Sequence, residues 1–226
     1  MENQLKINVS QLLDETEEAG VKLIAVSKTV PVETINEAIS YGVYAIGENK
    51  VQELLDKYEK LNKNNLEIHF IGRLQTNKVK YIIDKVDLIH SVDSFKLANT
   101  INKYAQNINK IQNVLVQVNI SEEDTKGGIN PENLTSFLKE ISVLSNIKVC
   151  GLMCIPAPEL KFGDNAKYFK MLSKMLVDNN NEKIDNISMN VLSMGMSGDY
   201  QTAIECGSTV VRVGSKIFGK RNYQEV

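Results

Sequence analysis

The sequence predicts an α/β fold in which eight parallel strands and their helices close into a (β/α)8 TIM barrel, with an additional N-terminal helix. Two observations lead to this prediction. Short β-rich runs alternate with amphipathic segments of helical period, which is the pattern of parallel strands joined by crossover helices. Eight such units within 226 residues also fit the usual length of this barrel, about 250 residues. An open doubly wound sheet is the alternative.

The expected elements follow one another in a regular order. The additional helix covers about residues 4–19, and the strands are expected at 22–27, 43–47, 67–71, 88–91, 114–120, 149–154, 189–193 and 209–213. Helices are expected near 31–40, 50–61, 77–84, 94–106, 131–144, 164–177 and 197–206, several with Pro, Ser or Asp at their starts. Residues 179–186 are expected to form a polar loop. Because no linker divides the chain, residues 1–226 are expected to form a single domain.

Composition and charge exclude several classes of protein. Hydrophobic residues make up 42% of the chain and charged residues 24%, which excludes disorder for most of it. The net charge is −2 and neither sign forms a long block, so we expect neither nucleic acid nor a membrane as a partner. Three cysteines and two histidines are too few for a disulfide framework or a Cys/His metal site. With no signal peptide and no stretch of roughly 18 apolar residues, the expected location is the cytoplasm.

A closed barrel confines the search for functional residues to the eight junctions that follow the strands. Such barrels carry their functional groups at the carboxyl ends of the strands. Lys28 directly follows the first expected strand. Partial burial there would disfavour its ammonium form, and the neutral amine could form a Schiff base with an aldehyde. The alternative interpretation is a solvated lysine at a strand end.

The last two junctions contain groups that suit an anion, and phosphate is most often bound after strands 7 and 8 of such barrels. The seventh junction includes Ser197, near the start of an expected helix, and the eighth places Gly214 and Ser215 directly after a strand. Glycine backbone and unpaired helix N–H groups can approach a phosphate closely. Ser197 could equally be a helix N-cap, and Arg212, within the apolar eighth strand, could equally form a structural ion pair.

The remaining junctions are polar but less specific. Asn49 lies in the second junction, and His69 and His90 belong to the third and fourth. Asparagine is also an ordinary capping residue, and a histidine within a strand is more often a core residue than a catalytic one. Lys126, on a glycine-containing loop after the fifth strand, would bring a second lysine to the same end of the barrel.

Six segments read Ala-Val-Ser-Lys at 25–28, Gly-Glu-Asn-Lys-Val-Gln-Glu at 47–53, His-Phe-Ile-Gly-Arg-Leu-Gln-Thr-Asn-Lys at 69–78, His-Ser-Val-Asp at 90–93, Leu-Ser-Met-Gly-Met-Ser at 192–197 and Val-Arg-Val-Gly-Ser-Lys-Ile-Phe-Gly at 211–219. Together they resemble the pyridoxal phosphate homeostasis protein family, whose fold is similar to the N-terminal barrel of alanine racemase. The resemblance covers nearly the whole chain and rests on several long motifs in the right order.

The resemblance implies that pyridoxal 5'-phosphate (PLP) is the cofactor and that Lys28 forms the internal aldimine with it. It also implies that Arg212 faces the pyridine nitrogen and that Ser197, Gly214 and Ser215 help to hold the phosphate. Asn49 is implied as a neighbour of the cofactor. The chain departs from the commonest pattern at Gly198 and at Ser215, where threonine is frequent, and both changes keep the needed flexibility or donor.

The function implied by the resemblance is intracellular PLP homeostasis, in which the protein holds PLP and buffers or delivers it. Transient contact with apo PLP-dependent enzymes is then expected. A cationic Arg212 opposes protonation of the pyridine nitrogen and so weakens the electron sink that PLP enzymes use, although alanine racemase is understood to use a similar arginine. We also expect no second domain to supply the other acid/base of a racemase.

We therefore expect a monomer that is not an enzyme. One alternative is a small PLP-dependent amino-acid racemase, for which the phenol of Tyr200 would have to reach the face of the cofactor opposite Lys28. We expect Tyr200 instead to lie on a helix surface. A third interpretation is a cofactor-free barrel isomerase that binds the phosphate of its substrate at the same place.

Overall fold

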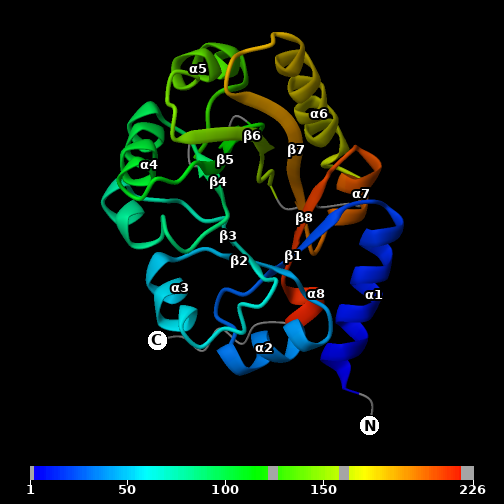
Figure 1. The fold of residues 1–226 in the computed structure, drawn as a ribbon. Helices are drawn as coiled ribbons and strands as arrows, with labels where there is room; N and C mark the ends of the chain where they lie inside the picture. The colour runs from blue at the N-terminus through cyan, green and yellow to red at the C-terminus, as the bar shows by residue number, and fades with distance from the viewer. Residues whose placement is uncertain (1–2, 122–126, 158–162, 220–226) are drawn as a thin grey trace.

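The computed structural model describes residues 3–121, 127–157 and 163–219. Eight parallel strands form a closed barrel in the order of the sequence, and β1 pairs with β8 to complete it (Figure 1). The strands are β1 (Lys22–Val26), β2 (Ala45–Glu48), β3 (Glu67–Phe70), β4 (Leu88–Val92), β5 (Gln112–Gln117), β6 (Ile147–Met153), β7 (Ile187–Met196) and β8 (Val210–Val213). The predicted barrel is confirmed, and the open doubly wound sheet is excluded.

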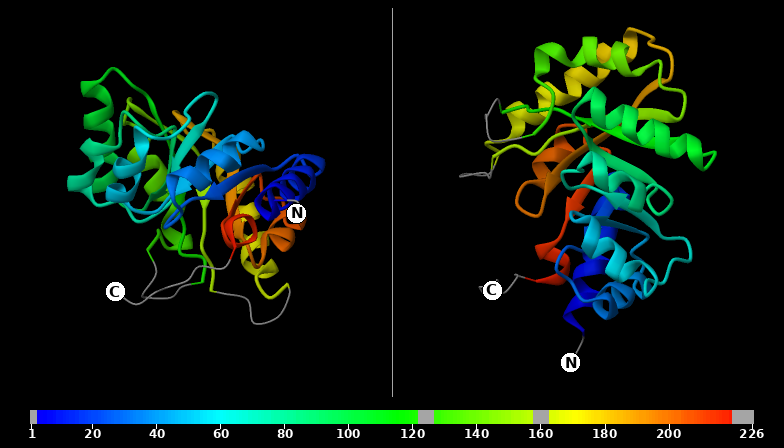
Figure 2. Two further views of the ribbon diagram at one scale, coloured as in Figure 1. Left: turned by 90° about the horizontal axis from the view of Figure 1, so that it is seen from below. Right: turned by 90° about the vertical axis from the view of Figure 1, so that its left-hand side faces the viewer.

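Helices surround the barrel on its outside (Figures 1 and 2). They are α1 (Gln4–Glu18), α2 (Val32–Ser40), α3 (Val51–Tyr58), α4 (Phe95–Asn107), α5 (Leu134–Ile141), α6 (Ala166–Asn181), α7 (Tyr200–Glu205) and α8 (Ser215–Phe218), with the 3-10 helices η1 (Thr76–Tyr81) and η2 (Pro131–Asn133). The additional helix α1 lies beside α8, where the Asn8 amide donates to the Ile217 carbonyl at 3.0 Å. Within the described part of the chain, no helix is both long and apolar enough to cross a bilayer.

The strand alternation decides which side chains enter the barrel interior. In β8, Val211 and Val213 belong to the large hydrophobic core formed with the helices. Arg212 lies between them and therefore points to the opposite side of the sheet, into the interior. The same alternation in β1 turns Ile24 inward, whereas Leu23 and Ala25 pack in the outer core. The position of Arg212 along its strand thus decides that its polar side chain enters the barrel interior.

The structure differs from the sequence prediction at several boundaries. The helix expected at 77–84 is the 3-10 helix η1, and the strand expected at 114–120 is β5, which begins and ends earlier. α6 continues through Asn181, into the expected polar loop. The helix expected to begin at Ser197 begins at Tyr200, because the Asp199 carboxylate accepts the Met196 N–H at 2.6 Å and holds a turn before it.

Candidate cofactor-binding site

A cavity of about 500 Å³ lies at the carboxyl ends of β1, β2, β7 and β8. All six residues predicted to bind the cofactor line it, namely Lys28, Asn49, Ser197, Arg212, Gly214 and Ser215. Apolar side chains complete the wall, including those of Val26, Ile71, Ile155 and Met196. A mostly apolar cavity of this size with a few convergent polar groups is typical of a site for a small molecule. The structure therefore brings the predicted residues together, and their roles toward a cofactor remain a prediction.

Lys28 extends into this cavity from the end of β1. Its side chain is half-buried, and its ammonium has no hydrogen-bond or ion-pair partner among the described residues. The next residue, Thr29, has a φ of 62°, a left-handed conformation that is strained for a β-branched residue. The Thr29 N–H donates to the Glu53 carboxylate, which holds the backbone in this conformation. The backbone conformation at Thr29 thus helps to direct the Lys28 side chain into the cavity.

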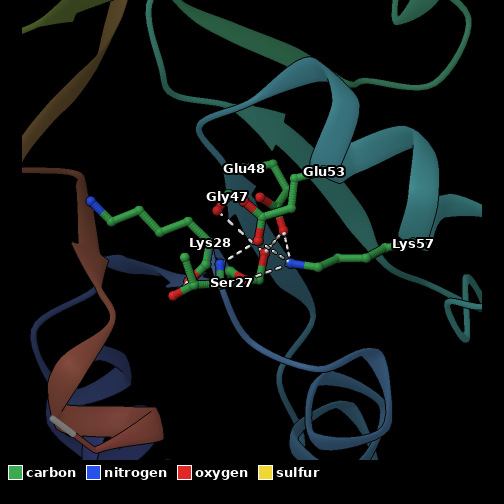
Figure 3. Close-up of polar contacts among 7 residues, drawn as sticks. Ser27, Lys28, Gly47, Glu48, Glu53 and Lys57 are labelled. Carbon is green, nitrogen blue, oxygen red and sulfur yellow. Dashed lines mark hydrogen bonds and ion pairs between the residues drawn. The ribbon is translucent and has the colours of Figure 1, made fainter. Parts of the chain in front are cut away.

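A buried ionic network underlies the β1 junction, and Figure 3 shows Lys28 pointing away from it. The Lys57 ammonium donates to the Ser27 carbonyl at 2.8 Å, to Glu48 Oε1 at 2.8 Å and to Glu53 Oε1 at 2.7 Å. The Ser27 hydroxyl donates to the same Glu48 oxygen at 2.7 Å. Burial raises the pKa of the Glu48 carboxyl, against the opposing effect of the Lys57 ammonium. The network ties α3 to the ends of β1 and β2.

The sequence prediction missed this network. The spacing of four residues between Glu53 and Lys57 is the usual sign of an ion pair on a helix, and this pair forms at 2.7 Å. Nothing in that spacing shows that the same lysine turns inward to Glu48, whose side chain is 1% exposed. The network contributes to the site by positioning Lys28, and it does not line the cavity.

Arg212 forms the inner end of the cavity and is 3% exposed. One terminal nitrogen donates to the Ser193 hydroxyl, and the other donates to the Cys154 carbonyl at 2.8 Å. No carboxylate within the described ranges lies at ion-pair distance from the guanidinium, so the structural ion pair considered from the sequence does not form there. Burial lowers the pKa of Arg212, but arginine remains a cation in proteins. A fixed positive charge therefore faces the cavity.

Ser197, Gly214 and Ser215 meet at the rim. The Gly214 N–H donates to the Ser197 hydroxyl oxygen at 3.1 Å, so this hydroxyl links the seventh junction to the eighth. Ser197 is not the N-cap of α7, which is Asp199. Gly214 is the N-cap of α8, so the N–H of Ser215 lies in a first turn that leaves it without a helical acceptor. The Ser197 hydroxyl hydrogen and the first turn of α8 are thus the available donors.

Asn49 supplies an unsatisfied polar atom. Its side-chain Oδ1 is buried and has no hydrogen-bond partner within the described residues. The third junction holds Asn49 in place, because a Cβ on Gly72 would lie 2.0 Å from the Asn49 carbonyl oxygen. Only glycine allows this close approach of the two junctions. A buried acceptor without a partner beside a cavity is suited to a ligand that carries a donor.

Comparison with known proteins identifies the family of this chain. The alanine racemase N-terminal domain family matches residues 2–222. A pyridoxal phosphate homeostasis protein of Aquifex aeolicus (strain VF5) is 49% identical over 203 residues, which make up 89% of this chain and 88% of that protein. The chain belongs to the pyridoxal phosphate homeostasis protein family. A member of this family from Escherichia coli (strain K12) is 36% identical over 235 residues and covers 99% of both chains.

Solved structures agree with the family assignment. PipY of Synechococcus elongatus PCC7942, determined with PLP bound, has a TM-score of 0.87 and 30% identity over 95% of this chain and 100% of its own. The same protein without PLP has a TM-score of 0.89. Alanine racemase of Streptomyces coelicolor A3(2) shares the fold at a TM-score of 0.77 and 16% identity, and the match covers 58% of that racemase chain.

The structure gives other candidate residues different roles. The Tyr200 hydroxyl donates to the Glu15 carboxylate at 2.6 Å, and its 2% exposed side chain does not line the cavity. It is therefore a buried link between α7 and α1 and not the helix-surface residue that was expected. His69 and His90 are buried inside the barrel, away from the cavity lining. Lys126 lies outside the described residues.

Proposed function

We propose that this protein binds PLP through Lys28 and serves PLP homeostasis by holding the cofactor and buffering or delivering it. The observation that carries the proposal is one cavity that combines a lysine amine, a buried guanidinium and hydroxyl and N–H donors at its rim. These groups match the aldehyde, the pyridine nitrogen and the phosphate of PLP. The proposal is supported by the relatives that are named pyridoxal phosphate homeostasis proteins and by the PipY structure with PLP.

The residues divide the work of binding. When bound, PLP supplies an aldehyde that reacts with an amine and an aromatic ring that can accept electrons. Lys28 would provide the amine, and Arg212 would meet the ring nitrogen. Ser197 and the first turn of α8 would donate hydrogen bonds to the phosphate, and Asn49 would accept one from a polar substituent of the cofactor. We propose that residues 1–226 form a single PLP-binding domain and that the protein is a monomer in the cytoplasm.

The same geometry supports a role without turnover. Arg212 is a permanent cation, which opposes protonation of the ring nitrogen and weakens electron withdrawal. A racemase also needs an acid/base on the face opposite Lys28. The hydroxyl of Tyr200, the candidate for this role, is hydrogen-bonded to the Glu15 carboxylate. Burial and this hydrogen bond raise the pKa of the Tyr200 phenol above its usual value. Slow proton exchange at an open site remains compatible with the proposal.

The decisive experiment is to load the protein with PLP, reduce it with borohydride and map the labelled peptide. We expect a visible absorption band and a reduced adduct on Lys28, and we expect both to disappear in Lys28→Ala. Lys126→Ala is the matched control and should keep both. An adduct that persists in Lys28→Ala and disappears in Lys126→Ala would contradict the assignment.

Turnover is measured separately. The loaded protein is incubated with L-alanine in deuterated water, and Cα exchange and the enantiomer ratio are followed together. Racemisation faster than about 1 s⁻¹, the low end of ordinary enzyme rates, would contradict the role without turnover. Transfer of PLP to an apo PLP-dependent enzyme, timed after mixing, tests the delivery function and the transient contact that it requires.

A further inference from the structure

A chain of hydrogen bonds crosses the interior of the barrel and ends at Arg212. Glu67 Oε2 lies 3.0 Å from His69 Nε2, and His69 Nδ1 lies 2.9 Å from His90 Nε2. His90 Nδ1 lies 3.0 Å from the Ser193 hydroxyl, which in turn contacts the Arg212 guanidinium. The two histidines and the serine are at most 1% exposed. We call these five residues, from β3, β4, β7 and β8, the polar relay.

The Arg212 end fixes the direction of the relay. A guanidinium can only donate, so the Ser193 oxygen accepts from Arg212. Among the described residues, His90 Nδ1 is the other polar partner of this hydroxyl and therefore the acceptor for its hydrogen. His90 Nδ1 is then the unprotonated nitrogen, and Nε2 carries the proton. His90 Nε2–H donates to His69 Nδ1, so His69 also carries its proton on Nε2, facing Glu67.

The Glu67 end agrees with the same direction. The Lys22 ammonium lies 2.7 Å from the Glu67 carboxylate, which is ionised in this ion pair and can only accept. With one proton on each ring, the opposite direction would leave the lone pair of His69 Nε2 facing this carboxylate without a proton between them. The contacts at both ends of the relay therefore favour one arrangement of protons.

In this arrangement each histidine ring carries a single proton, because the Nδ1 of each ring accepts a hydrogen bond. Burial, together with the neighbouring His69 and Arg212, holds the pKa of His90 well below its usual value. The charged groups at the ends of the relay are Glu67 with Lys22 at one end and Arg212 at the other. A proton on His90 Nδ1 would remove the acceptor of the Ser193 hydroxyl and add a cation beside the guanidinium.

The relay also joins two cavities. A second cavity of about 350 Å³ lies at the amino ends of the strands and is lined by Lys22, Glu67 and His69, among other residues. Arg212 lines the cofactor cavity at the carboxyl ends. Of the five N–H donors of a guanidinium, the contacts to Ser193 and Cys154 occupy two on the interior side. The remaining donors have no acceptor among the described residues and are available to the cofactor cavity, which Arg212 lines.

We propose that the polar relay is a positioning device for Arg212, in which both histidines are neutral and protonated on Nε2, and that it couples the cofactor cavity to Glu67 in the second cavity. Ser193, His90, His69 and Glu67 are positioning residues and do not contact the cofactor. The part of this inference that concerns the cofactor rests on the proposed function. The proton arrangement does not, because it is a property of the protein without ligand.

The arrangement can be read directly by long-range ¹H–¹⁵N NMR of the histidine rings in the cofactor-free protein. The sequence contains two histidines, so the spectrum contains signals from two imidazole rings. The His69→Gln variant lacks one set of signals and thereby assigns both. Protonated and unprotonated ring nitrogens have well separated ¹⁵N shifts. We expect Nε2 protonated and Nδ1 unprotonated in both rings at pH 7. A proton on Nδ1 of either ring would overturn the inference, whatever the outcome for Lys28.

Coupling to the cofactor is tested with two buried serines. Ser193→Ala removes the hydroxyl between His90 and Arg212, whereas Ser91→Ala removes a buried hydroxyl that has no partner among the described residues. We expect Ser193→Ala to move the His90 Nδ1 shift, alter the absorption of bound PLP and raise its Kd roughly 10-fold. Ser91→Ala should change none of these, and Ser193→Thr should restore them.

The adduct at Lys28 separates the two hypotheses. Equal responses of Ser193→Ala and Ser91→Ala, with the reduced adduct still on Lys28, would overturn the relay and leave the proposed function intact. Glu67→Leu extends the test to the far end, because it removes the terminal acceptor from the second cavity without touching the cofactor cavity. A change in the PLP absorption of this variant supports the coupling, and an unchanged spectrum contradicts it.

Discussion

At the cavity rim, the Ser197 side chain joins two junctions. Its oxygen accepts the Gly214 N–H, and its hydroxyl hydrogen has no acceptor among the described residues. A hydroxyl with this pairing is oriented before a phosphate arrives, which lowers the entropy lost on binding. Open space surrounds Gly198 beside it, since a Cβ there would meet no heavy atom within 4 Å. The rim is thus ordered by Ser197 and left accessible at Gly198.

We predict that Ser197→Ala combined with Ser215→Ala weakens PLP binding far more than it weakens binding of pyridoxal, which lacks the phosphate. Each lost hydrogen bond to a charged acceptor costs about 1.5–3 kcal/mol, or roughly 10- to 150-fold in affinity. Titrations of both ligands followed by absorption provide the measurement. A similar loss for the two ligands would place the phosphate elsewhere.

For individual residues, the sequence predicted which side chains lie at the strand ends but did not predict their hydrogen-bond partners. Lys28 and Arg212 could be predicted because a strand end and an interrupted apolar strand are visible in the order of residues. The pairing of Ser197 with Gly214 could not, because it depends on how two junctions meet in space. The predicted start of α7 was wrong because the Asp199 side chain accepts the Met196 N–H and holds residues 196–199 in a turn that is not part of the helix.

Among the elements, α3 has the largest influence on the site without lining it. It carries Lys57 back to the ends of β1 and β2, where one ammonium satisfies two carboxylates and a carbonyl (Figure 3). Burial and the neighbouring Glu53 raise the pKa of the Glu48 carboxyl, and the Lys57 ammonium opposes this effect. The junction that directs Lys28 therefore depends on a helix that follows it in the chain.

We predict that Lys57→Met lowers the free energy of unfolding by about 3–5 kcal/mol, since it leaves the buried Glu48 carboxylate unpaired. Adding Glu48→Gln should recover part of this loss, because the neutral amide tolerates burial without a cation. Lys63→Met is the control, as its pair with Glu59 is exposed and worth less than about 1 kcal/mol. Urea unfolding of these three variants and of the unchanged protein is the measurement, and equal losses at Lys57 and Lys63 would contradict the role of the network.

Helices and strands were predicted well where the hydrophobic period was clear. They were predicted less well where individual hydrogen bonds determine the type or the boundaries of an element. The strands and helices that form the barrel follow the alternation of the sequence. The segment after β3 is only the 3-10 helix η1, and β5 starts two residues before the expected strand. Gln112 begins β5 although it is polar, because its amide donates to the carbonyls of Asp87 and Asn113. The contact with Asp87, which directly precedes β4, cannot be read from the segment alone.

For the molecule as a whole, the polar interior makes stability depend on pH. His90 is fully buried and its pKa is held well below its usual value by burial, so the folded protein does not take up the proton that the unfolded chain binds below about 6.5. The pKa of the Glu67 carboxyl is lowered to about 2 by its hydrogen bond with His69, so it stays ionised in acid that protonates the unfolded chain. Both groups therefore stabilise the folded state at neutral pH and lose this effect on acidification.

We predict that the free energy of unfolding falls in two overlapping stages as the pH decreases. The first begins near pH 6.5 and belongs to His90, with a slope of up to about 1.4 kcal/mol per pH unit. The second belongs to Glu67 and extends from about 4.5 toward 2. His90→Asn should flatten the first stage and Glu67→Gln the second, as measured by urea unfolding across this pH range. A first stage that is unchanged in His90→Asn would contradict the assignment.

The closure of β1 onto β8 also has a consequence for biosynthesis. Lys28 and Asn49 come from the first part of the chain, whereas Ser197 and Arg212 come from its last part. At about 5–20 residues per second, a ribosome delivers Lys28 roughly ten to forty seconds before Arg212. During this interval the nascent chain contains the Lys28 amine without the groups that we propose for the phosphate and the ring. Selective binding of a cofactor in this cavity therefore requires that the last strand of the barrel has emerged and paired with the first.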